Sequence, residues 1–488
     1  MTTPLAALGW RIDNSYARLP ERLFSRTQPA PVRSPQIAVF NAALALDLGL
    51  DPQALEATGA GMFAGNELPP GADPIAQAYA GHQFGHFTNL GDGRAILLCE
   101  QLDSRGRRFD IQLKGSGRTP YSRGGDGRAA LGPMLREFIV SEAMHGLGIP
   151  TTRSLAVAAT GEWIMRNSPL PGAVLTRVAA SHIRVGTFQF AAATGDTQLS
   201  AALLDHAIAR HAPELAAAAD RPLAFLAAVV DRQAALVARW MLVGFVHGVM
   251  NTDNMAISGE TIDYGPCAFM DAYDPATVFS SIDHQGRYAY GNQPAIAHWN
   301  LARLAESLLP LLPGAPEAAV DRLRGVLETY PDRFATHHRA GARAKLGLTT
   351  SEDVDADLFD TLLRQMHASR ADFTTTFARL TAMAAAGAPE CGLGPGLADW
   401  QATWWARISR QPGGPAAAAA AMRRANPVVI ARNHRVEEAL AAAEAGDLGT
   451  VRRLLAVLRA PYAETTENEP YRGGPPCGTG PYRTFCGT

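Results

Sequence analysis

The 488 residues are enough for two or three structural units, and a composition of 47% hydrophobic and 18% charged residues excludes a disordered chain. A net charge of −2 predicts no broad basic face and no nucleic-acid partner. The sequence carries no signal-peptide pattern, no apolar run long enough to cross a membrane and no CxxC pair, so we expect a cytoplasmic, monomeric protein without membrane contact, structural zinc or a disulfide framework.

Residues 108–114 alternate between apolar and polar side chains, which predicts a half-buried strand with Lys114 turned away from the core. A loop rich in glycine and arginine follows, and Pro133 opens a predicted helix that ends near residue 145. Further strands are predicted at 163–166 and 173–178.

Beyond about residue 195 the pattern becomes helical. Apolar residues at helical spacing predict a helix over 223–241, and a short hairpin is expected at 255–262. Helices predominate from residue 296 to about 460, including the alanine-rich stretch 416–421. A strand-rich first part and a helix-rich second part predict an α+β protein with two lobes and a cleft between them.

Lysine is almost absent from the chain. Lys114 and Lys345 are two residues among 44 lysines and arginines, so arginine supplies nearly every positive charge. Lysine is a compact charge on a thin stem that can contact a phosphate inside a cleft. The lysine on the predicted strand is therefore a candidate functional residue.

Three features of the first part follow one another as they do in the nucleotide site of protein kinases. Gly91 and Gly93 form a glycine turn ahead of an apolar run, where backbone amides can approach phosphates. Lys114 lies on the next strand, and Glu137 lies on the following helix, where it can pair with Lys114 and hold it in place.

The second part carries the stronger pattern. His247 and Asn254 have the spacing of a kinase catalytic loop, and Asp263-Tyr-Gly265 matches the kinase metal motif Asp-Phe-Gly. Asn254 and Asp263 offer the oxygen ligands that Mg²⁺ prefers. Where a kinase has its catalytic aspartate this chain has Val249, which cannot accept a proton, and Asp253 is the nearest carboxylate that could replace it. The residues predict a nucleotide and metal site with an altered transfer geometry.

Longer stretches carry a family resemblance over nearly the whole chain. They are Asn14-Ser-Tyr-Ala-Arg-Leu19, Tyr79-Ala-Gly-His-Gln-Phe-Gly85, Asn89-Leu-Gly-Asp-Gly-Arg94, Gln112-Leu-Lys-Gly-Ser-Gly117, His247-Gly-Val-Met-Asn-Thr-Asp-Asn254 and Asp263-Tyr-Gly-Pro266. With these motifs the chain resembles the SelO (YdiU) family, the selenoprotein-O pseudokinases that act as protein adenylyltransferases. The resemblance implies a protein-kinase-like bilobal fold with a strand-rich N-lobe, a helical C-lobe and family-specific extensions. It also implies that ATP binds reversed relative to kinases, so that AMP passes to Ser, Thr or Tyr hydroxyls of proteins and pyrophosphate leaves.

The resemblance also implies roles for individual residues. Asp253 matches the family's proton acceptor, with Lys114 and Glu137 beside it in the catalytic set, and Asn254 and Asp263 match the ligands of Mg²⁺ or Mn²⁺. The implied nucleotide-binding residues are Gly91, Gly93, Arg94, Lys114, Asp126, Gly127, Arg177, Arg184 and Asp263. In a reversed pose the β- and γ-phosphates occupy what would be a kinase's adenine pocket, and arginines suit them there.

Four segments are expected from composition and resemblance together. Residues 1–75 are an N-terminal extension packing on the lobes, and 76–185 are a kinase-like N-lobe with the nucleotide-binding loops. Residues 186–460 are a helical C-lobe with the catalytic loop and metal motif, and 461–488 are a mobile tail.

Cys486 lies third from the C-terminus, where eukaryotic members of the family carry selenocysteine. A thiol at this position is available for exchange. We predict that Cys486 forms a reversible regulatory disulfide, with Cys477 or Cys267 as its partner.

Other functions stay open at the level of the sequence. They are uridylyl transfer from UTP with Mn²⁺, phosphotransfer with Asp253 as the base, and a pseudokinase scaffold that binds ATP without catalysis. Val249 disfavours phosphotransfer. Lys114, Glu137 and the two metal-ligand candidates argue against a scaffold.

Overall fold

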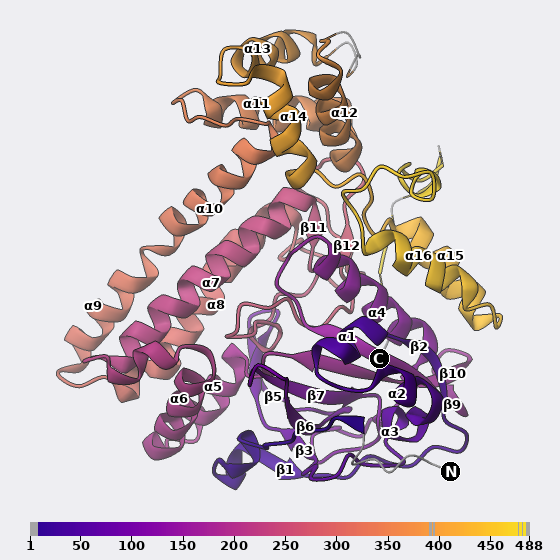
Figure 1. Ribbon diagram of the computed structural model, residues 1–488. Coiled ribbons are helices and arrows are strands. Elements are labelled where there is room, and N and C mark those ends of the chain that lie inside the picture. Colours follow the sequence, from indigo (N-terminus) through magenta and orange to yellow (C-terminus); the bar gives the residue numbers. More distant parts are fainter. Residues whose placement is uncertain (1–7, 390–392, 394–395, 477, 481, 485–488) are drawn as a thin grey trace.

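The first part of the chain is built on one antiparallel sheet, which lies at the bottom of the molecule in Figure 1. The computed structural model describes residues 8–389, 393, 396–476, 478–480 and 482–484. The sheet order is β1-β3-β6-β7-β10-β9-β2, and the short β8 pairs with β10; β4 and β5 form a separate hairpin. The strands are β1 (Phe24–Arg26), β2 (Gln36–Phe40), β3 (Ile75–Gln77), β4 (Ala80–Gln83), β5 (His86–Asn89), β6 (Ala95–Leu102), β7 (Arg108–Lys114), β8 (Ala129–Ala130), β9 (Arg153–Met165) and β10 (Pro169–Ala179).

Helices cover both faces of this sheet. Three short helices pack on one face, and α4 (Leu131–Gly146) packs on the other. The three are α1 (Ala42–Asp47), α2 (Pro52–Thr58) and α3 (Ala60–Ala64). In β7, Ile111 and Leu113 join the hydrophobic cluster under the short helices, whereas Lys114 points to the α4 side and meets Glu137. The face that carries Lys114 is therefore the face toward α4.

The polar face of β7 is not exposed, so the predicted half-burial of this strand is wrong. Asp110 and Lys114 are both buried. Asp110 lies 2.6 Å from Arg210, and Lys114 lies 2.7 Å from Glu137. Alternation along a strand identifies its apolar face, but it does not reveal the distant partners that cover the polar one.

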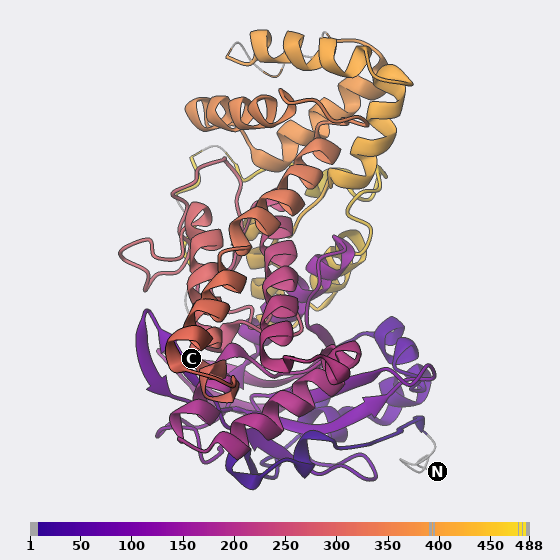
Figure 2. The same ribbon diagram turned by 90° about the vertical axis from the view of Figure 1, so that its left-hand side faces the viewer.

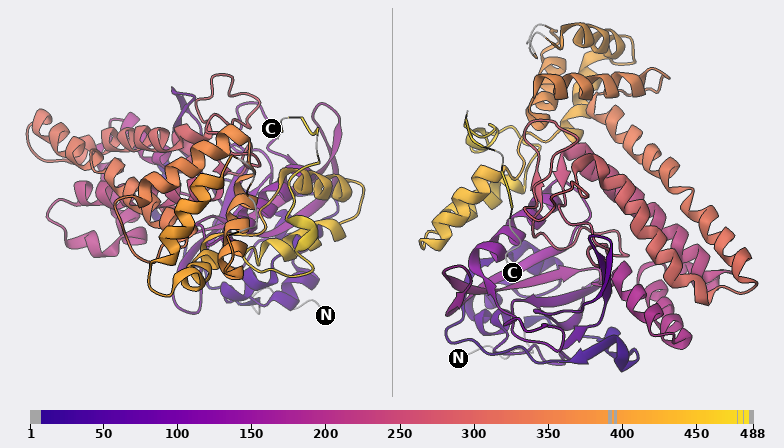
Figure 3. Two further views of the ribbon diagram at one scale, coloured as in Figure 1. Left: turned by 90° about the horizontal axis from the view of Figure 1, so that it is seen from above. Right: turned by 180° about the vertical axis from the view of Figure 1, so that it is seen from behind.

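The second part of the chain is mainly helical (Figures 1 and 2). Its helices are α5 (Val185–Ala193), α6 (Thr197–His211), α7 (Arg221–Val243), α8 (Gln293–Leu308), α9 (Pro316–Leu327), α10 (Tyr330–Lys345), α11 (Asp355–Ser369), α12 (Phe373–Ala386), α13 (Ala398–Ser409), α14 (Gly414–Ala425), α15 (Asn433–Glu444) and α16 (Gly449–Leu458). The long helices α7 and α10 lie side by side, and α11 to α14 form a group far from the sheet (Figure 3). None of the helices in the described part of the chain is long and apolar enough to span a bilayer.

Helix α7 ends just before the predicted catalytic loop. Asp220 caps its start by accepting a hydrogen bond from the Leu223 amide, and Gly244 ends it with a φ of +70°. The next residues form β11 (Phe245–Val246), which pairs with β12 (Ala268–Phe269). The two strands hold both ends of the loop 247–267.

Residues 255–262 do not form the predicted hairpin. Ala256 bridges to Arg184 and Thr261 bridges to Thr151, so both sides of the turn pair with the first part of the chain. The other predicted elements are present with different bounds. Helix α4 begins two residues before Pro133, the predicted strand at 163–166 is the end of the longer β9, which stops one residue earlier, and the predicted strand at 173–178 belongs to the longer β10.

The C-terminal segment packs against α4. Helices α15 and α16 pack against α4, and Tyr482 in the tail beyond them lies with its hydroxyl 2.8 Å from Nη1 of Arg136. Thr484 donates to the carbonyl of Pro266 at 2.8 Å. These contacts join the described tail to α4 and to the segment that follows Asp263.

Candidate active site

A cavity of about 380 Å³ opens between the sheet and the loop that follows α7. It is lined by every residue that the sequence associates with the nucleotide, the metal or the proton acceptor: Gly91, Gly93, Arg94, Lys114, Asp126, Gly127, Arg177, Arg184, Asp253, Asn254 and Asp263. The lining contains six arginines and Lys114 against four aspartates. This excess of positive charge favours a polyanionic ligand.

Lys114 belongs to a ring of four charges, of which Lys114, Arg177 and Asp263 line this cavity. Its Nζ lies 2.7 Å from Oε2 of Glu137 and 2.7 Å from Oδ1 of Asp263. Arg177 on β10 completes the ring, because its Nη2 lies 2.8 Å from Oδ1 of Asp263 and its Nε donates to Glu137. The Lys114–Glu137 pair expected from the spacing is present, and Arg177 is a third partner that the spacing did not indicate.

The cations of this ring counteract the effect of burial on the pKa values of its two carboxyl groups. Burial raises the pKa of Asp263, but Lys114 and Arg177 outweigh that effect and hold this pKa well below its ordinary value. Burial likewise raises the pKa of Glu137, and Arg177 and Lys114 lower it below its usual range. The two carboxylates therefore stay ionised beside the two cations.

His247 and Val249, both in the predicted catalytic loop, are held by a hydrogen bond and by core packing respectively. Nε2 of His247 lies 2.9 Å from the carbonyl oxygen of Ile262, which ties the loop to the residue before Asp263. Val249 is 6% exposed and packs in the hydrophobic core. The position of the kinase aspartate is thus filled by an apolar side chain in an apolar setting.

Asp253 lines the cavity, and one oxygen of its carboxylate lacks a hydrogen-bond partner among the described residues. Its Oδ1 is buried and makes no hydrogen bond with any described residue. Burial raises the pKa of this carboxyl to about 6. The backbone of Gly81 on β4 lies against it, and a Cβ at that position would stand 2.2 Å from Oδ1. Glycine is required at position 81 for the hairpin to approach this closely.

Asn254 and Asp263 provide oxygen atoms for a cation. Nδ2 of Asn254 donates to the carbonyl of Val249 at 3.0 Å, which leaves the amide oxygen available. Asp263 has a φ of +66°, a left-handed conformation that a non-glycine residue adopts only when its surroundings hold it there. Among the residues that the structure describes, no group of three His, Cys, Asp or Glu side chains could hold a metal. Mg²⁺ commonly uses one or two protein oxygens together with nucleotide phosphates, so this donor set fits it as a nucleotide complex.

Arg184, just before α5, is a buried cation with free donors. Its guanidinium lies 4.2 Å from the centre of the Tyr79 ring and 3.5 Å from Oδ1 of Asp92. Its Nε and Nη1 donate to no acceptor within the described ranges. Buried donors without partners are costly, and an anion in the cavity would satisfy them.

The glycine turn before β6 has a packing role in addition to the predicted one. A Cβ at Gly91 would stand 2.4 Å from the ring of Tyr121, and one at Gly93 would stand 2.9 Å from the Tyr121 carbonyl oxygen. Absence of side chains at these two positions lets the loop of Tyr121 lie on the turn and form a wall of the cavity.

Sequence reasoning missed several lining residues, among them Tyr79, Tyr121 and Arg166. Arg166 holds the predicted nucleotide residue Asp126, with Nη1 2.8 Å from Oδ2 and Nη2 3.0 Å from Oδ1. Arginine is abundant in this chain, so an arginine near the end of β9 did not stand out in the sequence as a site residue.

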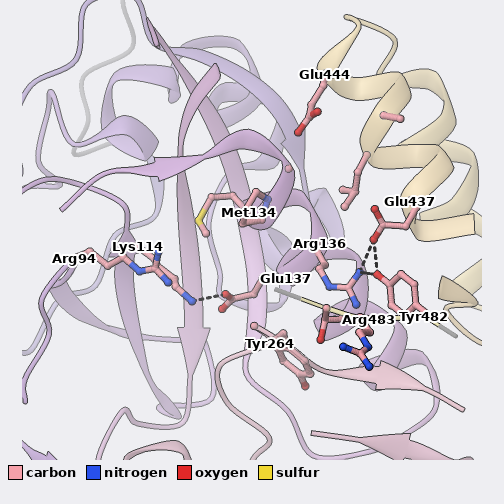
Figure 4. Close-up of a pocket in the computed structure, with 16 residues that line it drawn as sticks. Arg94, Lys114, Met134, Arg136, Glu137, Tyr264, Glu437, Glu444, Tyr482 and Arg483 are labelled. Atoms are coloured by element: carbon pink, nitrogen blue, oxygen red, sulfur yellow. Dashed lines mark hydrogen bonds and ion pairs between the residues drawn. The ribbon is translucent and has the colours of Figure 1, made fainter. Parts of the chain in front are cut away.

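A second cavity of about 450 Å³ borders the Lys114–Glu137 pair (Figure 4). Helix α4 forms one wall, and α15 and the tail form another. Nη1 of Arg136 lies 3.2 Å from Glu437 and 2.8 Å from the Tyr482 hydroxyl, and its Nη2 donates to the carbonyl of Cys267. This network secures the helix that carries Glu137.

The predicted redox residue Cys486 lies outside the described residues, as does Cys477. Cys267 is described and is a buried free thiol, and burial raises its pKa to about 12.

Comparison with known proteins identifies the family. Residues 7–459 match the family described as protein adenylyltransferase SelO. The chain belongs to the SelO family. Relatives named protein nucleotidyltransferase YdiU are 60% identical in Geobacillus kaustophilus, over 98% of this chain and 99% of the relative, and 59% identical in Cereibacter sphaeroides, over 98% and 100%. The relative of that name in Rhizobium rhizogenes is 57% identical, over 98% of this chain and 96% of the relative. The predicted resemblance is confirmed, and this SelO-family chain is an enzyme of the nucleotidyltransferase class with a mixed α/β fold.

Proposed function

We propose that this SelO-family enzyme transfers AMP from ATP to Ser, Thr or Tyr hydroxyls of proteins and releases pyrophosphate. The observation that carries the proposal is the presence in one cavity of two oppositely charged groups whose hydrogen bonding within the described chain is incomplete, the guanidinium of Arg184 and the carboxylate of Asp253. An anionic nucleotide satisfies the first, and the hydroxyl of an acceptor satisfies the second. The name of the relatives, protein nucleotidyltransferase, agrees with this function.

The proposed nucleotide lies reversed relative to that of kinases, within a kinase-like bilobal fold with lobes 76–185 and 186–460, an extension 1–75 and a tail 461–488. Arg177 on β10 and Arg184 before α5 lie where the chain passes from the sheet to the helices. Kinases bind adenine at the corresponding connection. Two buried arginines suit the β- and γ-phosphates there instead, and the α-phosphorus then faces Asp253.

In the proposed step the acceptor hydroxyl oxygen bonds to the α-phosphorus while the bond from that phosphorus to the bridging oxygen of the β-phosphate breaks. The carboxylate of Asp253, which lines the cavity, takes the proton of the hydroxyl. The electron pair of the broken bond leaves with pyrophosphate, whose charge Lys114, Arg177 and Arg184 stabilise.

Asn254 and Asp263 would hold Mg²⁺ or Mn²⁺ together with the nucleotide phosphates. The ion, when bound, neutralises phosphate charge. Without it, Asp263 accepts from Lys114 and Arg177, and these contacts keep its carboxylate ionised and oriented toward the cavity.

The decisive experiment uses ATP labelled at the α- or the γ-phosphate. We expect protein-bound label from the α position, none from the γ position, and loss of transfer in Asp253→Asn. Label from the γ position would overturn the proposal in favour of phosphotransfer. ATP binding without any transfer would favour a scaffold, and preferential transfer from α-labelled UTP with Mn²⁺ would favour uridylylation.

A further inference from the structure

The hairpin β4–β5 lies directly on the catalytic loop. The amide of His82 donates to Oγ1 of Thr252 at 2.7 Å, and the amide of Phe84 donates to Oδ1 of Asn251 at 3.1 Å. Gly81 of the same hairpin touches the Asp253 carboxylate. An acceptor chain that brings its hydroxyl to Asp253 therefore comes within a residue or two of this hairpin.

The outer side of the hairpin continues into a surface made of rings and arginines. We call it the hairpin patch, and it consists of His82, Phe87, Arg287, Trp299 and Arg303. Phe87 is 47% exposed, and the His82 ring lies 5.4 Å from Phe87 and 5.2 Å from Trp299 of α8. The guanidinium groups of Arg287 and Arg303 each lie 4.9 Å from the centre of the Trp299 ring.

The two arginines of the hairpin patch differ in their partners. Arg303 pairs with Glu306 at 2.7 Å. No carboxylate in the described part of the chain lies within ion-pair distance of Arg287, and its Nε makes no hydrogen bond there. A guanidinium that lies over a ring can still donate its terminal N–H groups to a carboxylate. Arg287, which also lies 5.7 Å from the centre of the Tyr288 ring, is therefore a half-buried cation without a carboxylate partner in the described part of the chain.

We propose that the hairpin patch docks the acceptor protein and selects hydroxyls that have an acidic side chain nearby, with Arg287 binding the carboxylate and Phe87 and Trp299 contacting the neighbouring apolar atoms. This inference rests on the proposed function for the identity of the acceptor. Aromatic and arginine side chains are the types that concentrate binding energy at protein interfaces. The hairpin patch thereby defines a substrate class, acidic segments around the modified hydroxyl.

The test measures binding separately from transfer. Fluorescein-labelled peptides of one length carry a single Ser, with Glu, Gln or Lys placed in turn at each flanking position, and bind to the full chain saturated with a non-hydrolysable ATP analogue. Fluorescence anisotropy gives the Kd for wild type, Arg287→Ala, Arg287→Lys and Arg287→Glu. Arg452→Ala, on the exposed side of α16, is the matched control.

In wild type we expect the best Glu peptide to bind about tenfold more tightly than its Gln counterpart, as a charge-assisted hydrogen bond allows. Arg287→Ala removes this preference, Arg287→Lys retains part of it, and Arg287→Glu shifts it toward the Lys peptide. The Kd for the ATP analogue and the melting temperature stay unchanged in all variants, as does the peptide preference in Arg452→Ala.

Equal binding of Glu and Gln peptides at every position in wild type, or an unchanged preference in Arg287→Glu, would overturn the docking role. The same peptides are then incubated with α- and γ-labelled ATP. A Glu preference in binding without α-label transfer would overturn the proposed function and leave the docking role standing, so the two failures are distinguishable.

Discussion

The two lysines of the chain are both buried, and the two regions that hold them do so in opposite ways. Lys114 on β7 is 5% exposed and lies 2.7 Å from each of two carboxylates, those of Glu137 and Asp263. Lys345 at the end of α10 is 2% exposed, and its Nζ lies 3.9 Å from the centre of the Phe377 ring. Within the described residues Lys345 has no carboxylate partner.

This difference separates a charge held by carboxylates, which we propose acts in catalysis, from one surrounded by aromatic side chains. Burial lowers the pKa of both lysines, but at Lys114 Asp263 and Glu137 act against it. At Lys345 burial acts alone and lowers the pKa to about 7. The region of Lys114 is polar and closed by opposite charges, whereas the region of Lys345 is an aromatic core that gains little from a cation.

The largest expected effect comes from Asp263→Ala, which removes a proposed metal ligand and the shared partner of Lys114 and Arg177. We expect a loss of ~10³-fold or more in transfer, since charge on the phosphates is then neutralised by neither the ion nor an ordered ring of cations. Incorporation of α-label into protein measures it. A variant that retained activity within a few-fold of wild type would show that Asp263 is no ligand.

The next effect is expected for Lys114→Met, which keeps the length of the side chain and removes the charge. Transfer should fall by about 10²-fold through lost stabilisation of the phosphates, with the fold retained. Steady-state kinetics, with circular dichroism as the check on folding, would measure both. Full activity in this variant would make Lys114 as dispensable to catalysis as we expect Lys345 to be.

Glu137→Gln should have a smaller effect than Lys114→Met, because it leaves the lysine present and only weakens its positioning. We expect about a tenfold loss in kcat/KM, which is the lower end of the losses seen when a residue that orients a functional group is changed. The double variant Lys114→Met, Glu137→Gln provides the control. If Glu137 acts through Lys114, the second change adds little to the first.

Lys345→Met is expected to leave transfer unchanged and to raise stability near neutral pH. The pKa of Lys345 is about 7 in the folded chain against an ordinary 10.5, so between these values the unfolded state binds more protons and wild-type stability rises with pH. The gain from Met is therefore largest below pH 7 and shrinks toward pH 10. Each unit by which the pKa is lowered corresponds to ~1.4 kcal/mol of lost wild-type stability at low pH. The gain from Met is smaller than this sum by the cation–π attraction between Lys345 and Phe377, which the variant loses.

Urea unfolding of wild type and Lys345→Met at pH 6.5 and pH 9.5 measures this effect. The difference in unfolding free energy should be greater at the lower pH. A variant less stable than wild type at pH 6.5 would mean that the ring contacts outweigh the cost of burying the cation, and the contrast between the two lysines would then be one of partners alone.

Local sequence patterns correctly predicted the helices and strands that carry the site. They failed to predict backbone pairing between segments that are distant in the sequence. The helices around Glu137 and before the catalytic loop, and the strand of Lys114, are present. The hairpin expected at 255–262 is not, because Ala256 and Thr261 pair with residues of the first part of the chain. A turn flanked by apolar residues has the same local appearance whether its sides pair with each other or with other segments.

The sequence by itself determined the order of the motifs, the family and part of the set of residues that line the cavity, since these depend on residue types and spacing along the chain. Only the tertiary structure decided how those residues are held. It makes Arg177 the partner of both Glu137 and Asp263, and it packs Val249 into the core. It also surrounds one lysine with carboxylates and the other with aromatic rings. These outcomes depend on contacts between residues far apart in the chain, and neither periodicity nor spacing contains that information.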